Sequence, residues 1–266
     1  MGVHIQLPPG VIDIQPEPAV AAGVSLYTVT YLSDGYKVKA AIAIPEQAGP
    51  LPALLYCRGG IKAVGKVRAE RISQMASFGY IVVAPHYRGN EGGEGRDEFG
   101  GAEREDIDAA FAWLRQMPQV VPERISLYGF SRGGMMALLA AIERKEFLAA
   151  VVWGGVSDLF LTYEERVDLR RMLKRIVGHP KKDRDAYLKR SPVFRAAEIN
   201  CPVLIIHGTE DQNVGVDHAK KLADALQLHG KPHELWLAEG ASHLFASEQI
   251  EDYTRRMFRW LNQVGN

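Results

Sequence analysis

The segment 129–133, Gly-Phe-Ser-Arg-Gly, matches the pattern G-x-S-x-G. An apolar run at residues 125–128 precedes it, and helix-forming residues at 135–142 follow it. A serine that ends a strand and begins a helix lies on a tight turn, with its hydroxyl exposed above the sheet. The N–H of Arg132 then lies at a helix N-terminus, where it can stabilise a developing oxyanion. The pattern indicates a nucleophile at Ser131; its plainer interpretation is a glycine-rich turn.

A serine hydroxyl needs a base, and the base needs a group that fixes its tautomer. In parallel α/β sheets, functional residues follow the C-terminal ends of strands. Of the eight histidines, His243 is the one that follows the last predicted strand in a loop, so we expect it to be the base. His207 lies at a strand end before Gly208, and we expect it to be structural.

Three acidic residues compete for the position beside His243. Asp211 comes directly after a predicted buried strand and is the best candidate. Glu210 is adjacent but is expected to point the other way. Asp158 follows the preceding strand and is the main alternative. We therefore predict the order Ser131, Asp211, His243.

A second oxyanion donor is expected from the glycines that follow the predicted strand at residues 54–57. The sequence there is Arg58-Gly59-Gly60-Ile61. Glycines after a buried strand permit close backbone approach. We select the N–H of Gly60, with Gly59 and Ile61 left open, and an ordinary turn as the other interpretation.

The glycine-rich loop at residues 85–95 resembles neither common phosphate-binding motif, because it lacks G-K-[ST] and does not run from a strand into a helix. We expect His86 and Arg88 in this loop to make structural hydrogen bonds or ion pairs rather than to contact substrate. No cofactor or metal is implied.

Apolar runs alternate with amphipathic segments from residue 54 onward. The predicted strands are residues 54–57, 80–84, 125–128, 148–153, 202–207 and 233–237. The predicted helices are residues 67–77, 103–117, 135–142, 216–229 and 245–264. This alternation predicts a mainly parallel sheet with helices on both faces. Before it, residues 24–32 and 36–44 predict an antiparallel hairpin, and residues 1–23 an extended lead-in.

The alternation is interrupted between two predicted strands, at about residues 155–198. Residues 162–177 read as one helix, and residues 180–190 are highly charged. The segment is too short and too polar for a core of its own. We expect one domain, 1–266, in which this insertion forms a small cap with a charged, solvated outer face.

Composition narrows the class of protein. The chain has 266 residues, 47% hydrophobic, with 32 basic and 32 acidic residues, so nothing favours a nucleic-acid or membrane partner. Two cysteines, Cys57 and Cys201, are too few for a disulfide framework, and we expect both to be buried and free. The N-terminus lacks a basic signal region, which favours a cytoplasmic protein. Formation of a homo-oligomer stays open.

The order Ser131, Asp211, His243 is that of α/β-hydrolases, and further segments make the resemblance specific. The chain resembles the catalytic domain of the prolyl oligopeptidase family, the branch with acylaminoacyl and dipeptidyl peptidases. The matching segments are residues 87–89 (Tyr-Arg-Gly), 129–134, 191–192 (Ser-Pro), 202–211 and 240–245. The resemblance implies an α/β-hydrolase fold and a serine hydrolase mechanism.

The chain departs from this family at two points. Arg58 stands where the family usually has a histidine; because the oxyanion donors are backbone N–H groups, we expect the oxyanion hole to survive. Peptidases of the family carry a β-propeller that sieves substrates, and the residues before the hairpin are too few for one. We therefore expect a serine hydrolase of small carboxylic esters, or alternatively a peptidase of short or N-acylated peptides.

Overall fold

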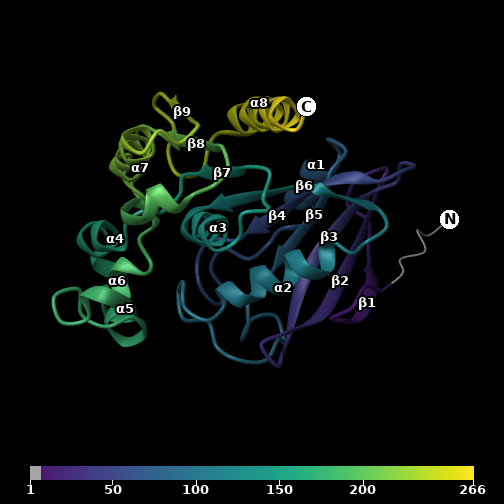
Figure 1. The fold of residues 1–266 in the computed structure, drawn as a ribbon, viewed down its shortest axis with the longest axis horizontal. Coiled ribbons are helices and arrows are strands. Elements are labelled where there is room, and N and C mark those ends of the chain that lie inside the picture. The colour runs from purple at the N-terminus through teal and green to yellow at the C-terminus, as the bar shows by residue number, and fades with distance from the viewer. Residues whose placement is uncertain (1–6) are drawn as a thin grey trace.

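One mixed β-sheet runs through the part of the chain that the computed structural model describes, residues 7–266 (Figure 1). Its strands are β1 (Val11–Glu17), β2 (Val24–Ser33), β3 (Tyr36–Pro45), β4 (Leu51–Cys57), β5 (Ile81–Pro85), β6 (Val120–Phe130), β7 (Ala150–Trp153), β8 (Val203–Gly208) and β9 (His233–Ala238). The α-helices are α1 (Ala69–Ala76), α2 (Arg104–Leu114), α3 (Arg132–Glu143), α4 (Leu159–Glu165), α5 (Arg170–Ile176), α6 (Arg184–Leu188), α7 (Asp217–Leu228) and α8 (Ser247–Val264). Two 3₁₀ helices are η1 (Val167–Leu169) and η2 (Pro192–Glu198).

Within the described residues, the strand order is β1-β2-β3-β5-β4-β6-β7-β8-β9. The pairs β1/β2, β2/β3 and β3/β5 are antiparallel. All later pairs are parallel. This confirms the predicted antiparallel hairpin and the mainly parallel sheet, and the architecture is that of an α/β-hydrolase.

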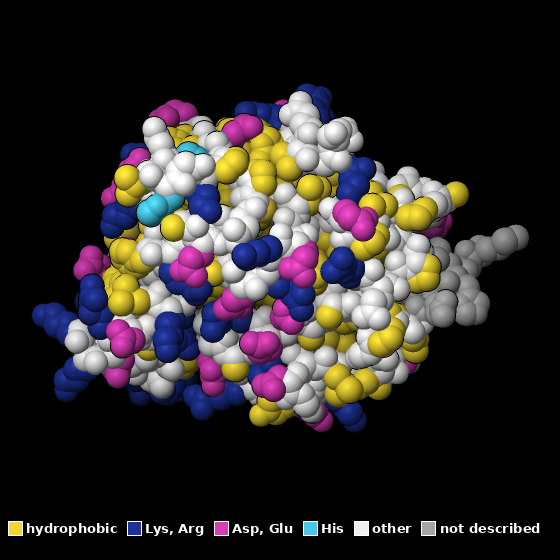
Figure 2. All heavy atoms as spheres, viewed as in Figure 1, with side chains coloured by type: hydrophobic (Ala, Val, Ile, Leu, Met, Phe, Trp, Pro, Cys, Tyr) yellow, Lys and Arg dark blue, Asp and Glu magenta, His cyan; other side chains and the backbone are white. Residues whose placement is uncertain are grey.

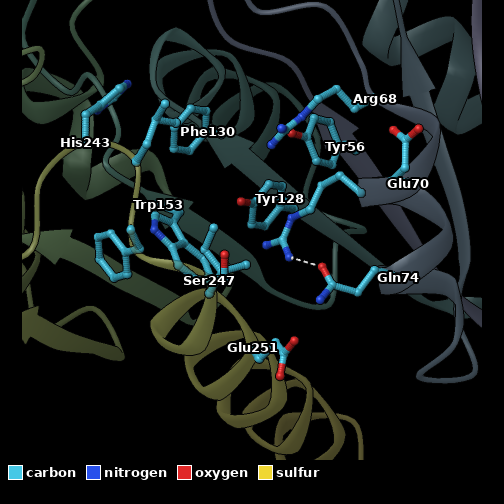
Figure 3. A pocket seen from close by; sticks show the side chains of 14 residues that line it. Tyr56, Arg68, Glu70, Gln74, Tyr128, Phe130, Trp153, His243, Ser247 and Glu251 are labelled. Carbon is cyan, nitrogen blue, oxygen red and sulfur yellow. Dashed lines mark hydrogen bonds between the residues drawn. The ribbon is translucent and has the colours of Figure 1, made fainter.

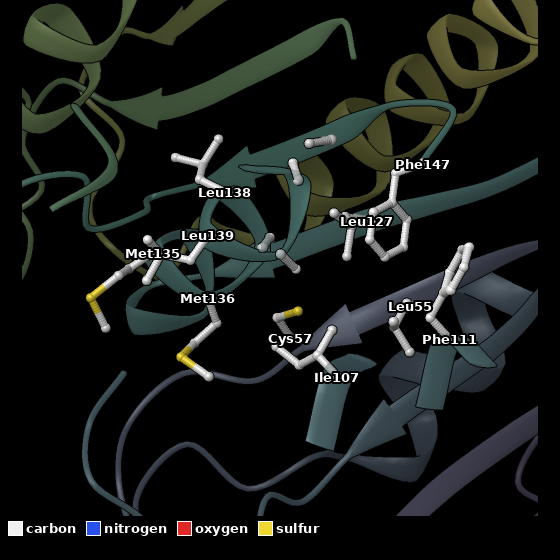
Figure 4. Close-up of a cluster of buried hydrophobic side chains, with 14 of the residues drawn as sticks. Leu55, Cys57, Ile107, Phe111, Leu127, Met135, Met136, Leu138, Leu139 and Phe147 are labelled. Carbon is white, nitrogen blue, oxygen red and sulfur yellow. The ribbon is translucent and has the colours of Figure 1, made fainter. Parts of the chain in front are cut away.

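Two hydrophobic layers hold helices against opposite faces of the sheet. Because side chains alternate along a strand, Leu127 of β6 faces one layer and Tyr128 faces the other. The first layer receives α2, α3 and α7, and the second receives α1 and α8. Figure 4 shows the first layer, where Met136 of α3 and Phe111 of α2 meet the strands. Cys57 and Cys201 are buried and free, as predicted.

The parallel strands bring their C-terminal ends to one edge of the sheet. Ser131 follows β6, Asp211 follows β8 and His243 follows β9. The strand register aligns the C-terminal ends of neighbouring strands. Gly129 of β6 pairs with Cys57 of β4, and Phe130 of β6 pairs with Trp153 of β7. The sheet therefore places these loops beside one another.

Two local predictions need correction. The lead-in at residues 1–23 includes a strand, β1, which pairs with β2; residues 1–6 lie outside the described part. The single helix predicted at 162–177 is broken, because the backbone of Arg166 is not helical (φ −102°, ψ 79°). The break lets the Arg166 guanidinium donate to the carbonyl of Asn213, a contact that no helical periodicity reveals.

The segment between β7 and β8 forms α4, η1, α5, α6 and η2. Lys and Arg side chains gather over its outer surface, in the region where Figure 1 places α5 and α6 (Figure 2). Glu165 of α4 also accepts a hydrogen bond from the N–H of Gly215, in the loop after β8. We propose that this segment is the predicted cap, since it contacts the loop that carries Asp211.

An ion pair in the interior joins the loop after β5 to α2. Arg88 and Asp106 are both buried, and the Arg88 Nη2 to Asp106 Oδ1 distance is 2.9 Å. Asp106 also accepts the hydroxyl of Ser33 at 2.7 Å. Burial raises the pKa of Asp106, although the hydrogen bonds from Arg88 and Ser33 oppose this effect. Arg88 thus has the structural role that the sequence predicts.

The substitution Arg88→Met should destabilise the protein strongly, because it leaves the Asp106 carboxylate buried and unpaired. Such a change costs about 3–5 kcal/mol. The matched control is Arg195→Met, which removes an exposed pair with Glu198 and should cost less than about 1 kcal/mol. Urea unfolding measures both, and equal costs would contradict the structural role of the buried pair.

Candidate active site

Ser131 occupies a left-handed turn between β6 and α3, with φ 57° and ψ −126°. Positive φ is uncommon outside glycine and is strained. Backbone hydrogen bonds on both sides hold the turn: the N–H of Ser131 donates to Trp153 O at 3.1 Å, and its carbonyl accepts from Val156 N at 3.0 Å. The turn is therefore fixed by the neighbouring strand β7.

The two motif glycines are explained by close backbone contacts rather than by flexibility. A Cβ at Gly133 would lie 1.9 Å from the carbonyl oxygen of Cys57, and one at Gly129 would lie 2.2 Å from that of Gly133. Any side chain would force the serine turn away from β4. The spacing of the motif is thus a packing requirement of this turn.

His243 and Asp211 form a short hydrogen bond. His243 Nδ1 lies 2.7 Å from Asp211 Oδ2, and the His243 ring packs on Phe130, the residue before Ser131, with ring centroids 4.8 Å apart. The other carboxylate oxygen of Asp211 accepts the N–H groups of Asn213 and Val214, each at 2.9 Å. Within residues 7–266, no hydrogen bond joins Ser131 Oγ to His243.

This geometry fixes the tautomer of His243. An ionised Asp211 carboxylate can accept hydrogen bonds but cannot donate them. In the neutral imidazole, Nδ1 therefore carries the proton and Nε2 remains a proton acceptor. Burial alone would raise the pKa of Asp211. The hydrogen bonds from His243 and from two backbone N–H groups outweigh it and hold that pKa below its ordinary value of 3.8.

The competing candidates have other partners. Asp158 caps α4, accepting the N–H of Phe160 at 2.9 Å, and Glu210 is exposed. His207 is buried, with Nε2 2.8 Å from the carbonyl of Val214, and burial lowers its pKa. The structure thus brings His243 together with Asp211 and with neither of the other two acids.

The loop at residues 58–65 lies directly against Ser131. A Cβ at Gly59 would be 3.0 Å from Ser131 Cβ, and Gly60 has a positive φ of 61°. Among the described residues, the Gly60 N–H has no backbone acceptor. The N–H of Arg132, in the first turn of α3, has no intrahelical acceptor either. These are the two donors that the sequence predicts for the oxyanion.

Arg58 organises this loop from inside the protein. Its buried guanidinium donates to the carbonyls of Lys62 (2.9 Å), Val64 (2.7 Å), Gly65 (3.1 Å) and His86 (3.1 Å). Burial lowers the pKa of Arg58. A residue that departs from the family pattern thus fixes the shape of the loop.

The side chain of Arg132 is a positioning group that the sequence analysis missed. It is buried and bonds Asp97 through both oxygens, at 2.7 and 2.9 Å, and it also pairs with Glu103. It donates to the carbonyl of Gly60 at 2.8 Å. Glu103, the residue before α2, thus reaches the serine turn through Arg132.

The imidazole of His86 forms no hydrogen bond with the candidate site, although the His86 carbonyl accepts one from Arg58. Its Nδ1 is buried without a partner in the described residues, and burial lowers the pKa of His86 to about 4. Across residues 7–266, no cluster of three or more histidine, cysteine or acidic residues has the arrangement of a metal site. No helix in that range is long and apolar enough to cross a bilayer.

The Asp211 contribution to stability should depend on pH. Its folded pKa lies below the unfolded one, so the contribution is complete above pH 3.8. It is lost as the pH falls through the folded value, because the unfolded chain binds the proton first. The cost of Asp211→Asn in the free energy of unfolding should therefore be larger at about pH 6 than at about pH 2.5. Urea unfolding at both pH values tests this, and an equal cost would contradict it.

Comparison with known proteins places this geometry in a family. The prolyl oligopeptidase family matches residues 66–266. An uncharacterised peptidase, YtmA, of Bacillus subtilis is 46% identical over 94% of this chain and 98% of its own length. Dipeptidyl-peptidase 5 of Porphyromonas gingivalis is 28% identical over 80% of this chain, which spans only 33% of that protein.

A solved structure shows the same architecture. A puromycin-hydrolysing peptidase of Mycobacterium tuberculosis superposes with a TM-score of 0.77 at 27% identity, over 86% of this chain and 37% of that one. The two proteins are thus similar both in sequence and in the arrangement of their strands and helices. The chain belongs to the prolyl oligopeptidase family and is a hydrolase of this group of serine peptidases with the α/β-hydrolase fold.

Proposed function

We propose that this hydrolase cleaves small carboxylic esters through an acyl-enzyme formed on Ser131. The observation that carries the proposal is the 2.7 Å bond from His243 to Asp211 beside a strained serine turn. This arrangement leaves His243 Nε2 unprotonated, as a general base requires. Formation of the Ser131 Oγ to His243 hydrogen bond is then expected when substrate binds, since such bonds tighten in the complex.

The reaction follows from the roles of these groups. Ser131 Oγ attacks the ester carbonyl while His243 takes its proton, and Asp211 stabilises the imidazolium that forms. His243 then gives the proton to the leaving alcohol. Water, activated by the same imidazole, attacks the acyl-enzyme and releases the acid. No metal or cofactor is needed for this sequence.

The negative charge of the tetrahedral intermediate needs donors that are already in place. We assign the N–H groups of Arg132 and Gly60, which lie at the start of α3 and in the loop against Ser131. Such preorganised donors stabilise charge without the cost of reorienting solvent. The Arg132 side chain joins both donor segments through its bond to the Gly60 carbonyl.

A second candidate activity is cleavage of short or N-acylated peptides. It is favoured by membership in a peptidase family. The groups and steps are the same, but an amine is a poorer leaving group than an alcohol and needs better proton donation by His243. Because the ester reaction makes the smaller demand on His243, we rank esters first and peptides second as substrates of Ser131, Asp211 and His243.

The first test is steady-state turnover of a short-chain p-nitrophenyl ester and of an N-acyl-aminoacyl p-nitroanilide. We expect ester turnover that falls by at least about 10⁴-fold in kcat for Ser131→Ala. Negligible anilide turnover would support an esterase, and comparable turnover would support the peptidase. Full ester activity in Ser131→Ala would exclude the proposed nucleophile.

A further test concerns Arg58 as a positioning residue. In Arg58→Met the carbonyls of Lys62, Val64 and Gly65 lose their common donor, so the Gly60 N–H should lose its fixed orientation. Loss of one oxyanion donor costs about 10²–10³-fold in kcat. We expect a decrease of about tenfold or more in kcat, with a smaller change in KM, because the donor acts on the transition state.

Two variants separate this role from a general loss of stability. Arg58→Lys retains one cationic donor and should recover part of kcat. Gly60→Ala adds a Cβ that would lie 2.3 Å from Val64 O, and it should reduce kcat in a similar way. A folded Arg58→Met protein with wild-type kcat, as judged by thermal unfolding and kinetics, would refute the positioning role.

A further inference from the structure

A hollow beside the candidate site lies between α1 and α8. It is a pocket of about 420 Å³ within the described residues. His243 and Phe130, the neighbours of the proposed chemistry, form part of its wall. The pocket lies on the face of the sheet that carries the second hydrophobic layer, away from α3. Neither the sequence motifs nor the mechanism uses it.

Aromatic rings form much of the pocket wall. Tyr56 and Tyr128 come from adjacent strands, with ring centroids 4.9 Å apart, and Trp153 continues the row from β7. Figure 3 shows these rings around the pocket, with Arg68 on one side and Glu251 of α8 on another. A flat, apolar group of a ligand would fit this wall by stacking.

Arg71 supplies a cationic group inside the aromatic pocket. It is half-buried, and its guanidinium carbon lies 5.5 Å from the centroid of the Trp153 ring. Nη1 donates to Gln74 at 2.7 Å and to Thr254 at 2.9 Å. Its guanidinium also lies beside the hydroxyl of Tyr128. Within residues 7–266, Arg71 forms no ion pair. A charged fork in an aromatic pocket is suited to a carboxylate.

Two hydroxyls extend the polar part of the pocket. Tyr128 is only 2% exposed. Burial raises the pKa of Tyr128, and the nearby Arg71 guanidinium opposes this effect. Tyr56 is half-buried. A ligand carboxylate bound to Arg71 would also meet these two hydroxyls. Glu70 and Glu251 also line the pocket, but both side chains are exposed to solvent and pair with neither arginine.

The position of the pocket decides which part of a substrate it would hold. In acyl transfer, the imidazole of the base protonates the leaving group, so the leaving group must contact His243. We propose that this pocket binds a leaving group with an aromatic side chain and a free carboxylate, which Arg71 recognises. The inference rests on the proposed function, and it names the substrate class: esters of aromatic 2-hydroxy acids, or peptides that end in an aromatic residue.

The chemical step balances without any further reactant. Ser131 Oγ bonds to the acyl carbon, and the bond from that carbon to the leaving oxygen or nitrogen breaks. The leaving atom takes the proton that His243 removed from the serine. Water then forms the carboxylic acid and restores Ser131. The products are an acid and an aromatic hydroxy or amino acid.

Binding to the inactive Ser131→Ala protein tests the pocket independently of turnover. L-3-phenyllactate is titrated by calorimetry against its neutral amide, L-3-phenyllactamide. We expect the carboxylate to bind at least about tenfold more tightly than the amide. Adding Arg71→Met should remove this preference, and Arg71→Lys should retain part of it. The matched control is Arg255→Met, an exposed arginine of α8 that does not line the pocket.

Turnover of matched substrates tests the same residue in the wild-type enzyme. Hippuryl-phenyllactate and hippuryl-phenyllactamide share the scissile ester and differ only in the carboxylate. We expect kcat/KM to be at least about tenfold higher for the acid, and equal for both in Arg71→Met. Hippuryl-phenylalanine and its amide provide the peptide pair, which distinguishes the two sources of the leaving group.

The outcomes separate the two proposals. If p-nitrophenyl esters are cleaved but phenyllactate binds no better than its amide, the pocket assignment is overturned and the proposed function stands. If phenyllactate binds through Arg71 but no ester or peptide is cleaved, the carboxylate site stands and its role in leaving-group recognition falls with the proposed function. If the Arg71→Met protein does not fold, Arg71→Lys and Tyr128→Phe replace it as test variants. Each should weaken binding of the carboxylate. Unchanged binding in both variants would overturn the site.

Discussion

The buried guanidinium of Arg132 is the interaction on which the candidate site depends. It joins three segments that are distant in sequence: the serine turn, the loop of Gly60, and the region of Asp97 and Glu103 before α2. Removing a charge from water is costly, and only good geometry with full hydrogen bonding offsets that cost. Here both carboxylates face the cation, and the rings of Tyr87 and Phe99 flank it. The turn and the oxyanion loop are therefore held in one fixed relation.

Arg58 is also a buried cation, but its hydrogen-bond acceptors differ from those of Arg132. Its cation has backbone carbonyls instead of carboxylates as acceptors, so it adds no counter-charge next to the serine. Arg132 and Arg58 thus act on the same loop, one through the carbonyl of Gly60 and the other through the residues after it. The proposed oxyanion donors are backbone N–H groups, so their direction depends on how these carbonyls are held. Arg58, in place of the usual family histidine, supports the loop through side-chain hydrogen bonds and leaves the proposed backbone donors unchanged.

The sequence analysis succeeded where the signal is local. The strand–glycine–serine–helix pattern locates Ser131, and the rule that functional residues follow strand ends selects Asp211 and His243, which the structure brings within 2.7 Å of each other. It failed where partners are distant or a helix is interrupted. Nothing near Asp97 indicates its pairing with Arg132. Helical periodicity continues through Arg166, although the backbone is not helical there and the Arg166 side chain donates to Asn213. Pocket residues from several strands and two helices have no common sequence pattern.

Comparison of the interior arginines shows why Arg71 differs from the others. Arg132 has two carboxylates, Arg88 has Asp106, and Arg58 has four carbonyls. Arg71 has only neutral partners, which are Gln74, Thr254 and the hydroxyl of Tyr128, and it lines an aromatic pocket. These other interior arginines direct most of their donors at carboxylates or carbonyls of the protein, whereas Arg71 has no charged partner and lines the space beside His243. That contrast, more than the size of the pocket, is the physical reason to assign it an anionic ligand.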